Sequence, residues 1–188
     1  MGLITRTQPV GVDVTIGRLQ RDLFIELTNI WNRDYESFPR IYKNHKGDDV
    51  LPEWCKENGE YTGDLLFDDT KTVNSFWVVD DDRTYDHKKY VFTHNAAMIV
   101  QAKLDKLYKD CKDKSRLDEK IVDDVRRAIK ATYWTSRYKE AITGIDKIYS
   151  DFKISDKKKY FYNMSNFCTV RFNFVLLYDN TLQSNPLK

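Results

Sequence analysis

The chain has 188 residues, of which 41% are hydrophobic and 14% aromatic, so it can bury a core and is not a disordered chain. Its 31 Lys and Arg nearly balance its 29 Asp and Glu, and the net charge of +2 gives no general case for nucleic-acid binding. Residues 1–95 carry 12 basic and 17 acidic residues, a net charge of −5, whereas residues 96–188 carry 19 and 12, a net charge of +7. This asymmetry predicts separate acidic and basic surfaces if the two halves do not interleave in the fold.

Cysteine usage and hydropathy restrict the cellular setting. Cys55, Cys111 and Cys168 lie far apart and form no CxxC pair, which argues against a disulfide framework and a structural zinc and favours reduced thiols in a cytoplasm. The first residues contain no apolar core of a signal peptide. No apolar run approaches the roughly 20 residues that span a bilayer. The sequence therefore predicts a soluble intracellular protein.

The N-terminal segment is predicted to be an extended arm followed by a helix. Residues 1–14 form the arm, because Pro9 and Gly11 interrupt any periodicity. A helix is predicted from about Thr15, with Asp13 or Thr15 as its cap. Its apolar positions recur at helical spacing, at Ile16, Leu19, Leu23, Leu27, Ile30 and Trp31.

From Phe38 to Phe92 the pattern changes to short runs of β-forming residues separated by polar turns. The candidate strands are "FPRIYKN", "EYTGDLLF", "KTVNSFWVV" and "YVFTH". The turns between them are rich in Asp, Asn and Gly, which tolerate tight backbone geometry. This region is expected to form a meander or paired hairpins.

Three helices and a last strand are predicted in the remainder. The first helix has an apolar stripe from Ala96 to Leu107. The second begins at "SRLD", where Ser115 and Asp118 have the spacing of a capping box. The third spans 133–152 with a break near Gly144. "FCTVRFNFVLLYD" alternates in the manner of a strand with one buried face, and 179–188 is expected to be a flexible tail. The sequence thus predicts a single α+β domain over 15–178, with a small, mostly antiparallel sheet packed against amphipathic helices.

The segment from Asp80 to His87 has two interpretations. Its four aspartates and one histidine could bind a metal, with His94 as a further ligand. Transition-metal ligands usually converge from different elements, however, and the glutamate that would end a calcium loop is missing. A solvent-exposed polar turn of about ten residues is the favoured interpretation.

Two other clusters leave alternatives open. Asp68, Asp69 and Lys71, with Glu60 upstream, are arranged somewhat as in metal-dependent nucleases, although hairpin residues explain them more simply. The run "ISDKKKYFYNM" could stack bases on its aromatic rings and contact phosphates, or could be a lysine-rich turn before a buried strand. No GxSxG, HExxH, Walker or GxGxxG pattern is present, so no catalytic, metal or cofactor residue is predicted.

Three segments carry a resemblance to a known group of proteins. "MGLITRTQPVGVDVTIGRLQRDLFIELT", "YTGDLLFDDTKTVNSFWVV" and "FCTVRFNFVLLYDNT" together resemble small virion proteins of crAss-like tailed bacteriophages. Such proteins are similar to neck or head-to-tail connector subunits, which form rings beneath the portal. The resemblance covers most of the chain and rests on the order and texture of its segments, with no diagnostic motif.

The resemblance implies a structural rather than an enzymatic role. It implies a homo-oligomeric ring in the virion neck or tail that contacts the portal and other neck or tail proteins. DNA would pass through the lumen of the ring without sequence-specific binding. The resemblance also implies no membrane partner and assembly in the host cytoplasm. The arm is then expected to reach a neighbouring subunit through Leu3, Ile4, Arg6, Pro9, Val10 and Val12. A metal-dependent nuclease and a nucleic-acid-binding accessory protein remain the alternatives.

Overall fold

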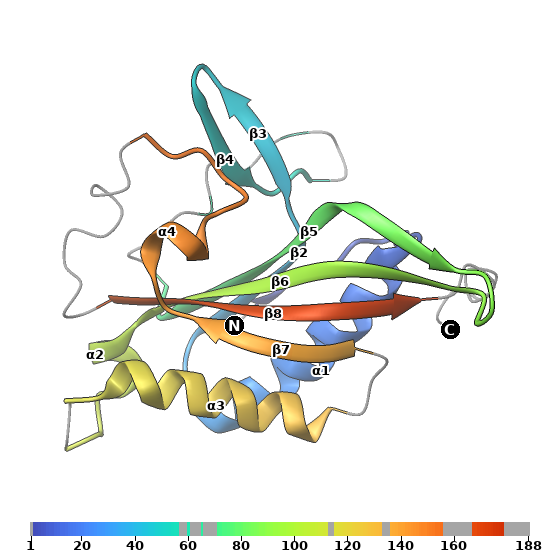
Figure 1. The fold of residues 1–188 in the computed structure, drawn as a ribbon. Helices are drawn as coiled ribbons and strands as arrows, with labels where there is room; N and C mark the ends of the chain where they lie inside the picture. The colour runs from blue at the N-terminus through green and yellow to red at the C-terminus, as the bar shows by residue number, and fades with distance from the viewer. Residues whose placement is uncertain are drawn as a thin grey trace.

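A six-stranded, mostly antiparallel sheet forms the centre of the protein in the computed structural model (Figure 1). The structure describes residues 2–56, 60, 65, 71–112, 115–132, 136–155 and 167–178. In spatial order the strands of the sheet are β1 (Gly2–Leu3), β2 (Tyr35–Arg40), β5 (Val73–Asp86), β6 (Val91–Lys103), β8 (Phe167–Tyr178) and β7 (Ser136–Ile142). A separate hairpin consists of β3 (Tyr42–Lys46) and β4 (Asp49–Glu53). The helices are α1 (Val12–Trp31), α2 (Leu104–Leu107), α3 (Leu117–Ala131) and α4 (Ile145–Ile148).

The pairing of the strands confirms the predicted α+β class and the mostly antiparallel sheet. β1, β2 and β5 pair in parallel, and the pairs β5–β6, β6–β8 and β8–β7 are antiparallel. The register of β6 and β8 is unbroken from Phe92 opposite Tyr178 to Lys103 opposite Phe167. These two long strands therefore form an uninterrupted ladder within the sheet.

One face of the sheet is covered by α1 and α3. The predicted stripe of α1 is confirmed, because its apolar residues pack in the same cluster as alternate residues of β5, β6 and β8. The helix begins at Val12 rather than Thr15, after Gly11, whose φ of 58° is easily adopted by glycine. The predicted cap is wrong, because no side chain caps this helix and Asp13 instead forms an ion pair with Arg40.

A buried carboxylate connects the helices to one another. Asp124 of α3 accepts hydrogen bonds from Trp31 Nε1 of α1, at 3.2 Å, and from the Tyr108 hydroxyl after α2, at 2.8 Å. Lys120 lies 3.4 Å from its other oxygen. Burial and the neighbouring carboxylate raise the pKa of Tyr108, so this hydroxyl remains a donor at physiological pH.

The opposite face is covered over only part of its area. The β3–β4 hairpin, α4 and the segment up to Ile154 pack there on Phe76, Val78 and Ile99 of the sheet. Figure 1 shows α4 and the hairpin over one end of the strands, while no described element lies over the other end. We call this uncovered part the open face; it presents Thr93 and Asn95 of β6 beside Val175 and Leu177 of β8.

Two predicted helices are wrong. The stripe from Ala96 belongs to β6, and only Leu104–Leu107 is helical. β6 is central and buried on both faces, with Ala96 and Met98 toward the helices and Ile99 toward α4, so its apolar run does not show the period of a strand. The helix predicted over 133–152 is β7 followed by the short α4, although the break at Gly144 is in the predicted place.

The length of the aspartate-rich turn is also corrected. β5 continues through the aspartates to Asp86, and only residues 87–90 form the turn to β6.

"FPRIYKN" spans two strands, β2 and β3, rather than one. The second helix starts at Leu117 without the side-chain cap expected from Ser115. The last strand is confirmed as β8, with Val170, Phe172 and Phe174 buried.

The predicted arm lies on its own domain. β1 pairs with β2, and the Ile4 amide donates to the Ser37 carbonyl oxygen at 2.9 Å. Gln20 of α1 is buried, and its amide donates to the carbonyl oxygens of Ile4 and Ser37, both at 3.0 Å. Backbone groups of the arm thus find partners on β2 and α1 of the same chain, and the arm is shorter than the predicted 1–14 because α1 begins at Val12. The candidate strand "EYTGDLLF", apart from Glu60 and Leu65, and the tail 179–188 lie outside the described residues.

Candidate polar pocket and charged surfaces of the sheet

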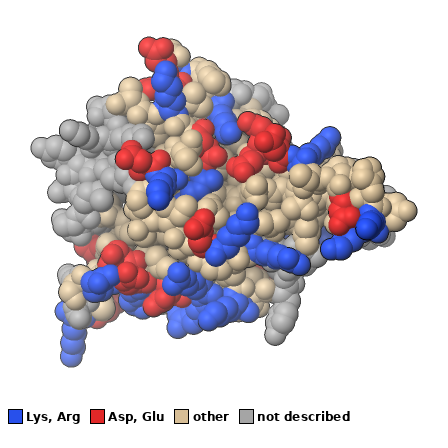
Figure 2. Space-filling view, in the orientation of Figure 1, with Lys and Arg blue, Asp and Glu red and all other residues tan. Residues whose placement is uncertain are grey.

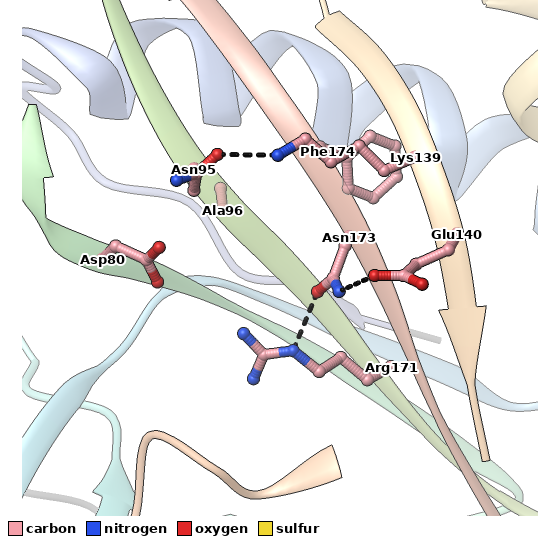
Figure 3. A pocket seen from close by; sticks show the side chains of 8 residues that line it. All are labelled: Asp80, Asn95, Ala96, Lys139, Glu140, Arg171, Asn173 and Phe174. Carbon is pink, nitrogen blue, oxygen red and sulfur yellow. Dashed lines mark hydrogen bonds between the residues drawn. The ribbon is translucent and has the colours of Figure 1, made fainter. Parts of the chain in front are cut away.

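A shallow polar pocket of about 210 Å³ lies at the border between α4 and the open face (Figure 3). Four neighbouring strands line it, with side chains of Asp80, Asn95, Ala96, Lys139, Glu140, Arg171, Asn173 and Phe174. We therefore take it as the first candidate for a functional site.

Arg171 is the centre of a hydrogen-bonded network beside this pocket. Its guanidinium forms an ion pair with Asp151 and donates to the Ile148 carbonyl oxygen at 3.2 Å, which ties β8 to the end of α4. Its Nε donates to Asn173 Oδ1 at 2.8 Å, and the Asn173 amide donates to Glu140 Oε1 at 3.1 Å. Buried charges are stable only when they are paired in this way. The network thus fastens α4 and β7 to the central strand.

The two remaining charged groups of the pocket differ in their contacts. Lys139, in a bulge of β7, donates from Nζ to Asn95 Oδ1 at 3.0 Å, across the width of β8. Asp80 makes no hydrogen bond or ion pair within the described part of the chain, and its carboxylate lies at the rim of the pocket in Figure 3. The pocket therefore offers one uncommitted carboxylate beside groups that are already bonded to one another.

Asp80 begins an irregular stretch of β5 that we call the acidic bulge, residues Asp80, Asp81 and Asp82. Val79 pairs with Ala96 and Arg83 pairs with His94, so three residues of β5 lie opposite the single residue Asn95. The Asp81 side chain is 93% exposed and lies 3.4 Å from Lys43, which is its ion-pair partner. Asp82 is also exposed, as a solvated polar segment is expected to be.

The histidines do not gather with these aspartates. His87 lies in the turn, where its ring meets Tyr85 edge-on at 4.7 Å between centroids. His94 lies on β6 and is buried beside Tyr178. Within the described residues, no three His, Cys, Asp or Glu side chains are placed to hold a metal ion.

His94 has an unusual environment for a titratable group. Its side chain is 8% exposed, and neither ring nitrogen has a hydrogen-bond partner in the described structure. Burial lowers the pKa of His94, and the positive charges of Arg40 and Arg83 lower it further, whereas Asp80 acts in the opposite direction. The imidazole is therefore neutral at physiological pH.

The residues expected to contact a neighbouring subunit are divided by the structure. Arg6 stacks on Trp54 and Tyr42, 5.0 and 5.1 Å from the ring centroids, and donates to the Arg40 carbonyl oxygen at 2.9 Å. Leu3 is half-buried in β1, Ile4 packs on the hydrophobic cluster beneath the hairpin, and Val12 is buried in α1. Val10 is 67% exposed and Pro9 is half-buried. Contact between subunits through this segment stays a prediction, with Val10 as its most accessible side chain.

The other sequence clusters are only partly described. Lys71 lies 3.4 Å from Glu36, and Glu60 is 3.8 Å from Lys56, whereas Asp68 and Asp69 of the nuclease-like cluster lie outside the described residues. Most of "ISDKKKYFYNM" lies outside them too. The three cysteines are free thiols, and burial raises the pKa of Cys168 to about 12.

A second charged surface, missed by the sequence-based search for sites, faces the free edge of β7. We call it the basic strip, and its residues are Arg126, Arg127, Lys130, Arg137 and Lys139. All five are exposed, and Arg126 Nε donates to the Tyr138 hydroxyl at 3.2 Å, which joins the helix to the strand. Figure 2 shows Lys and Arg side chains gathered where α3 and β7 lie in Figure 1. The clue in the sequence was the positive charge of the second half.

Comparison with known proteins adds no family. No protein-family model matches the chain, and no curated protein sequence is significantly similar to it. No helix in the described residues is both long enough and apolar enough to cross a membrane. Evidence about function therefore comes from the surfaces of this chain and from the resemblance of its sequence segments.

Proposed function

We propose that the protein is a structural subunit of a tailed-phage virion, a ring-forming component of the neck or tail that connects portal and tail. The observation that carries the proposal is the open face of the sheet, which ends in the acidic bulge on one side and the basic strip on the other. A subunit whose task is assembly needs outward-facing surfaces of this kind, whereas an enzyme needs a converging set of reactive groups.

The contacts in the polar pocket support the same conclusion. Its arginine, lysine and glutamate are engaged in hydrogen bonds or ion pairs that join β6, β7, β8 and α4. These bonds stiffen the strands that form the open face. A stiff surface loses little conformational entropy when it binds a neighbour, which favours ordered assembly.

Electron microscopy of purified virions tests the proposal. An antibody raised against the protein and coupled to gold is expected to label the junction between head and tail of the phage that encodes it. The purified protein should also produce particles with rotational symmetry when it is imaged at high concentration.

Two results would contradict this function. One is the absence of the protein from virions that are shown by mass spectrometry to contain the portal and tail proteins. The other is cleavage of plasmid DNA by the purified protein in the presence of Mg²⁺, which would favour the nuclease alternative.

A further inference from the structure

We propose that the basic strip of one copy of this chain binds the acidic bulge of a neighbouring copy. The inference rests on the proposed function as a ring subunit and names the two surfaces that meet. The partner is a second copy of the same chain, because both members of the complementary pair are present on one molecule.

The acidic bulge is costly for the isolated chain. Asp is a poor strand former, and three carboxylates in succession repel one another. Lys43 forms an ion pair with Asp81, whereas Asp80 and Asp82 form no hydrogen bond or ion pair with other described residues. Bulges beside functional surfaces re-aim side chains, and in this one Asp81 and Asp82 are exposed to solvent. A cationic surface outside the molecule would compensate the remaining charge.

The basic strip has the complementary property. Arg126 and Arg127 lie 3.8 and 3.5 Å from carboxylates of their own helix, Asp123 and Asp124. Lys130 and Arg137 make no hydrogen bond or ion pair with described residues, although both are exposed. The strip therefore retains positive charge, and it wraps around the free edge of the sheet, where another molecule has access.

Within one molecule the two surfaces approach each other only at the polar pocket, which Asp80 and Lys139 both line. β6 and β8 lie between β5 and β7, so three strand spacings of about 4.8 Å separate the strands by roughly 14 Å. This distance exceeds the Debye length of about 8 Å at physiological ionic strength. In a head-to-tail contact the basic strip of each copy binds the acidic bulge of one neighbour. Repetition of this contact about a rotation axis closes a ring.

Nucleic acid is the less favoured partner of the strip. The chain as a whole has a net charge of only +2, and the acidic bulge on β5 would repel a phosphate backbone that extended from β7 across the sheet. A second copy places opposite charges against both surfaces at once. Electrostatic complementarity of this kind fixes register and excludes wrong partners more than it adds affinity.

Charge reversal tests the contact. The first variant is Asp81→Lys with Asp82→Lys, and the second is Lys130→Glu with Arg137→Glu. Association is measured by native mass spectrometry and sedimentation of the full chain at about 0.1 M and about 1 M salt, where the Debye length falls from about 10 Å to about 3 Å. We expect each variant to associate at least about tenfold more weakly than the natural chain, because like charges then face each other.

Restoration by complementary charges is the decisive arm of the test. In an equimolar mixture the lysines of the first variant face the glutamates of the second, and the remaining natural surfaces face each other, so alternating oligomers should form again. A single chain with all four changes should recover self-association for the same reason. The control, Asp48→Lys with Asp105→Lys, changes the net charge as the first variant does, at exposed positions outside both surfaces, and should associate normally.

The outcomes separate this inference from the proposed function. If both variants associate as strongly as the natural chain, the proposed contact is wrong. The same holds if neither the mixture nor the fourfold variant restores association. In both cases virion labelling could still support a ring subunit. A natural chain that stays monomeric at high concentration would also overturn it. Salt-sensitive binding of a fluorescent DNA duplex that Lys130→Glu with Arg137→Glu abolishes, without any change in association, would assign the strip to nucleic acid instead.

Discussion

At the scale of single residues, two buried polar side chains show opposite solutions to the cost of burial. Asp124 receives hydrogen bonds from Trp31 and Tyr108 and a nearby lysine, so its desolvation is compensated. His94 is buried without a hydrogen-bond partner among the described residues, close to the charges of Arg40 and Arg83. Such a group destabilises the fold whenever it must accept a proton.

The environment of His94 predicts a loss of stability on acidification. Its pKa in the folded chain is lower than the value of about 6.5 expected in the unfolded chain, so below that pH the unfolded state binds more protons. The free energy of unfolding should therefore fall as the pH decreases from about 7 toward the lowered pKa, with a contribution of up to about 1.4 kcal/mol per pH unit. Urea unfolding of the natural chain between pH 7.5 and 5 measures this slope.

His94→Phe isolates the contribution from that of the carboxylates. The variant keeps an aromatic ring in the site but cannot bind a proton, so its stability should depend less steeply on pH over the same range. Parallel pH profiles for the two proteins would show that His94 titrates alike in the folded and unfolded states.

At the scale of elements, predictability depends on how many faces of an element are buried. α1 and β8 were predicted correctly because each shows a clear period, of about 3.6 residues for the helix and of two for Val170, Phe172 and Phe174. β6 was mistaken for a helix because both of its faces are buried and its residues 96–100 are all apolar. β7 was missed because it is an edge strand whose bulge at Lys139 interrupts the alternation.

The candidate surfaces were only partly predictable for a related reason. The aspartates from Asp80 to Asp82 are conspicuous in the sequence, and the expected solvent exposure holds for Asp81 and Asp82, whereas Asp80 is half-buried in the wall of the pocket. Their place in a strand depends on pairing with β6, and no local pattern contains that information. The basic strip combines α3 with β7, which the tertiary fold brings together at the Tyr138 hydroxyl.

The arm provides a prediction at this scale, since its contacts are within the chain. Arg6→Ala removes a guanidinium that lies over Trp54 and Tyr42 and donates to the Arg40 carbonyl oxygen. A cation–π contact and a hydrogen bond each contribute about 0.5–1.5 kcal/mol, so we expect the free energy of unfolding to fall by roughly 1–3 kcal/mol. Chemical denaturation followed by tryptophan fluorescence measures the change.

Gln8→Ala is the matched control for this prediction. Gln8 is exposed and lies in the same segment, and its truncation should change stability by less than about 0.5 kcal/mol. If Arg6→Ala is as mild as the control but prevents ring formation, the arm acts between subunits, as the sequence suggested.

At the scale of the whole molecule, two hydrophobic clusters share one sheet. The larger cluster lies between the sheet and the helices α1 and α3, and the smaller lies beneath the β3–β4 hairpin and α4. β5 and β6 contribute to both clusters, and Arg171 of β8 bonds to the α4 side while its neighbour Phe172 packs on the other side. A disturbance of either cluster therefore reaches the strands that support the other.

This arrangement predicts a single cooperative unfolding transition that substitutions on either side weaken. Phe172→Ala leaves a cavity in the larger cluster and should cost roughly 3–5 kcal/mol, and Ile148→Ala in the smaller cluster should cost roughly 2–5 kcal/mol. Ile25→Ala on α1, where the side chain is 50% exposed, is the control and should cost much less. Calorimetry should show one peak for every variant, shifted to lower temperature in the first two. A separate early transition in Ile148→Ala alone would mean that the hairpin and α4 unfold independently, and that the open face is bordered by a unit able to detach from the sheet.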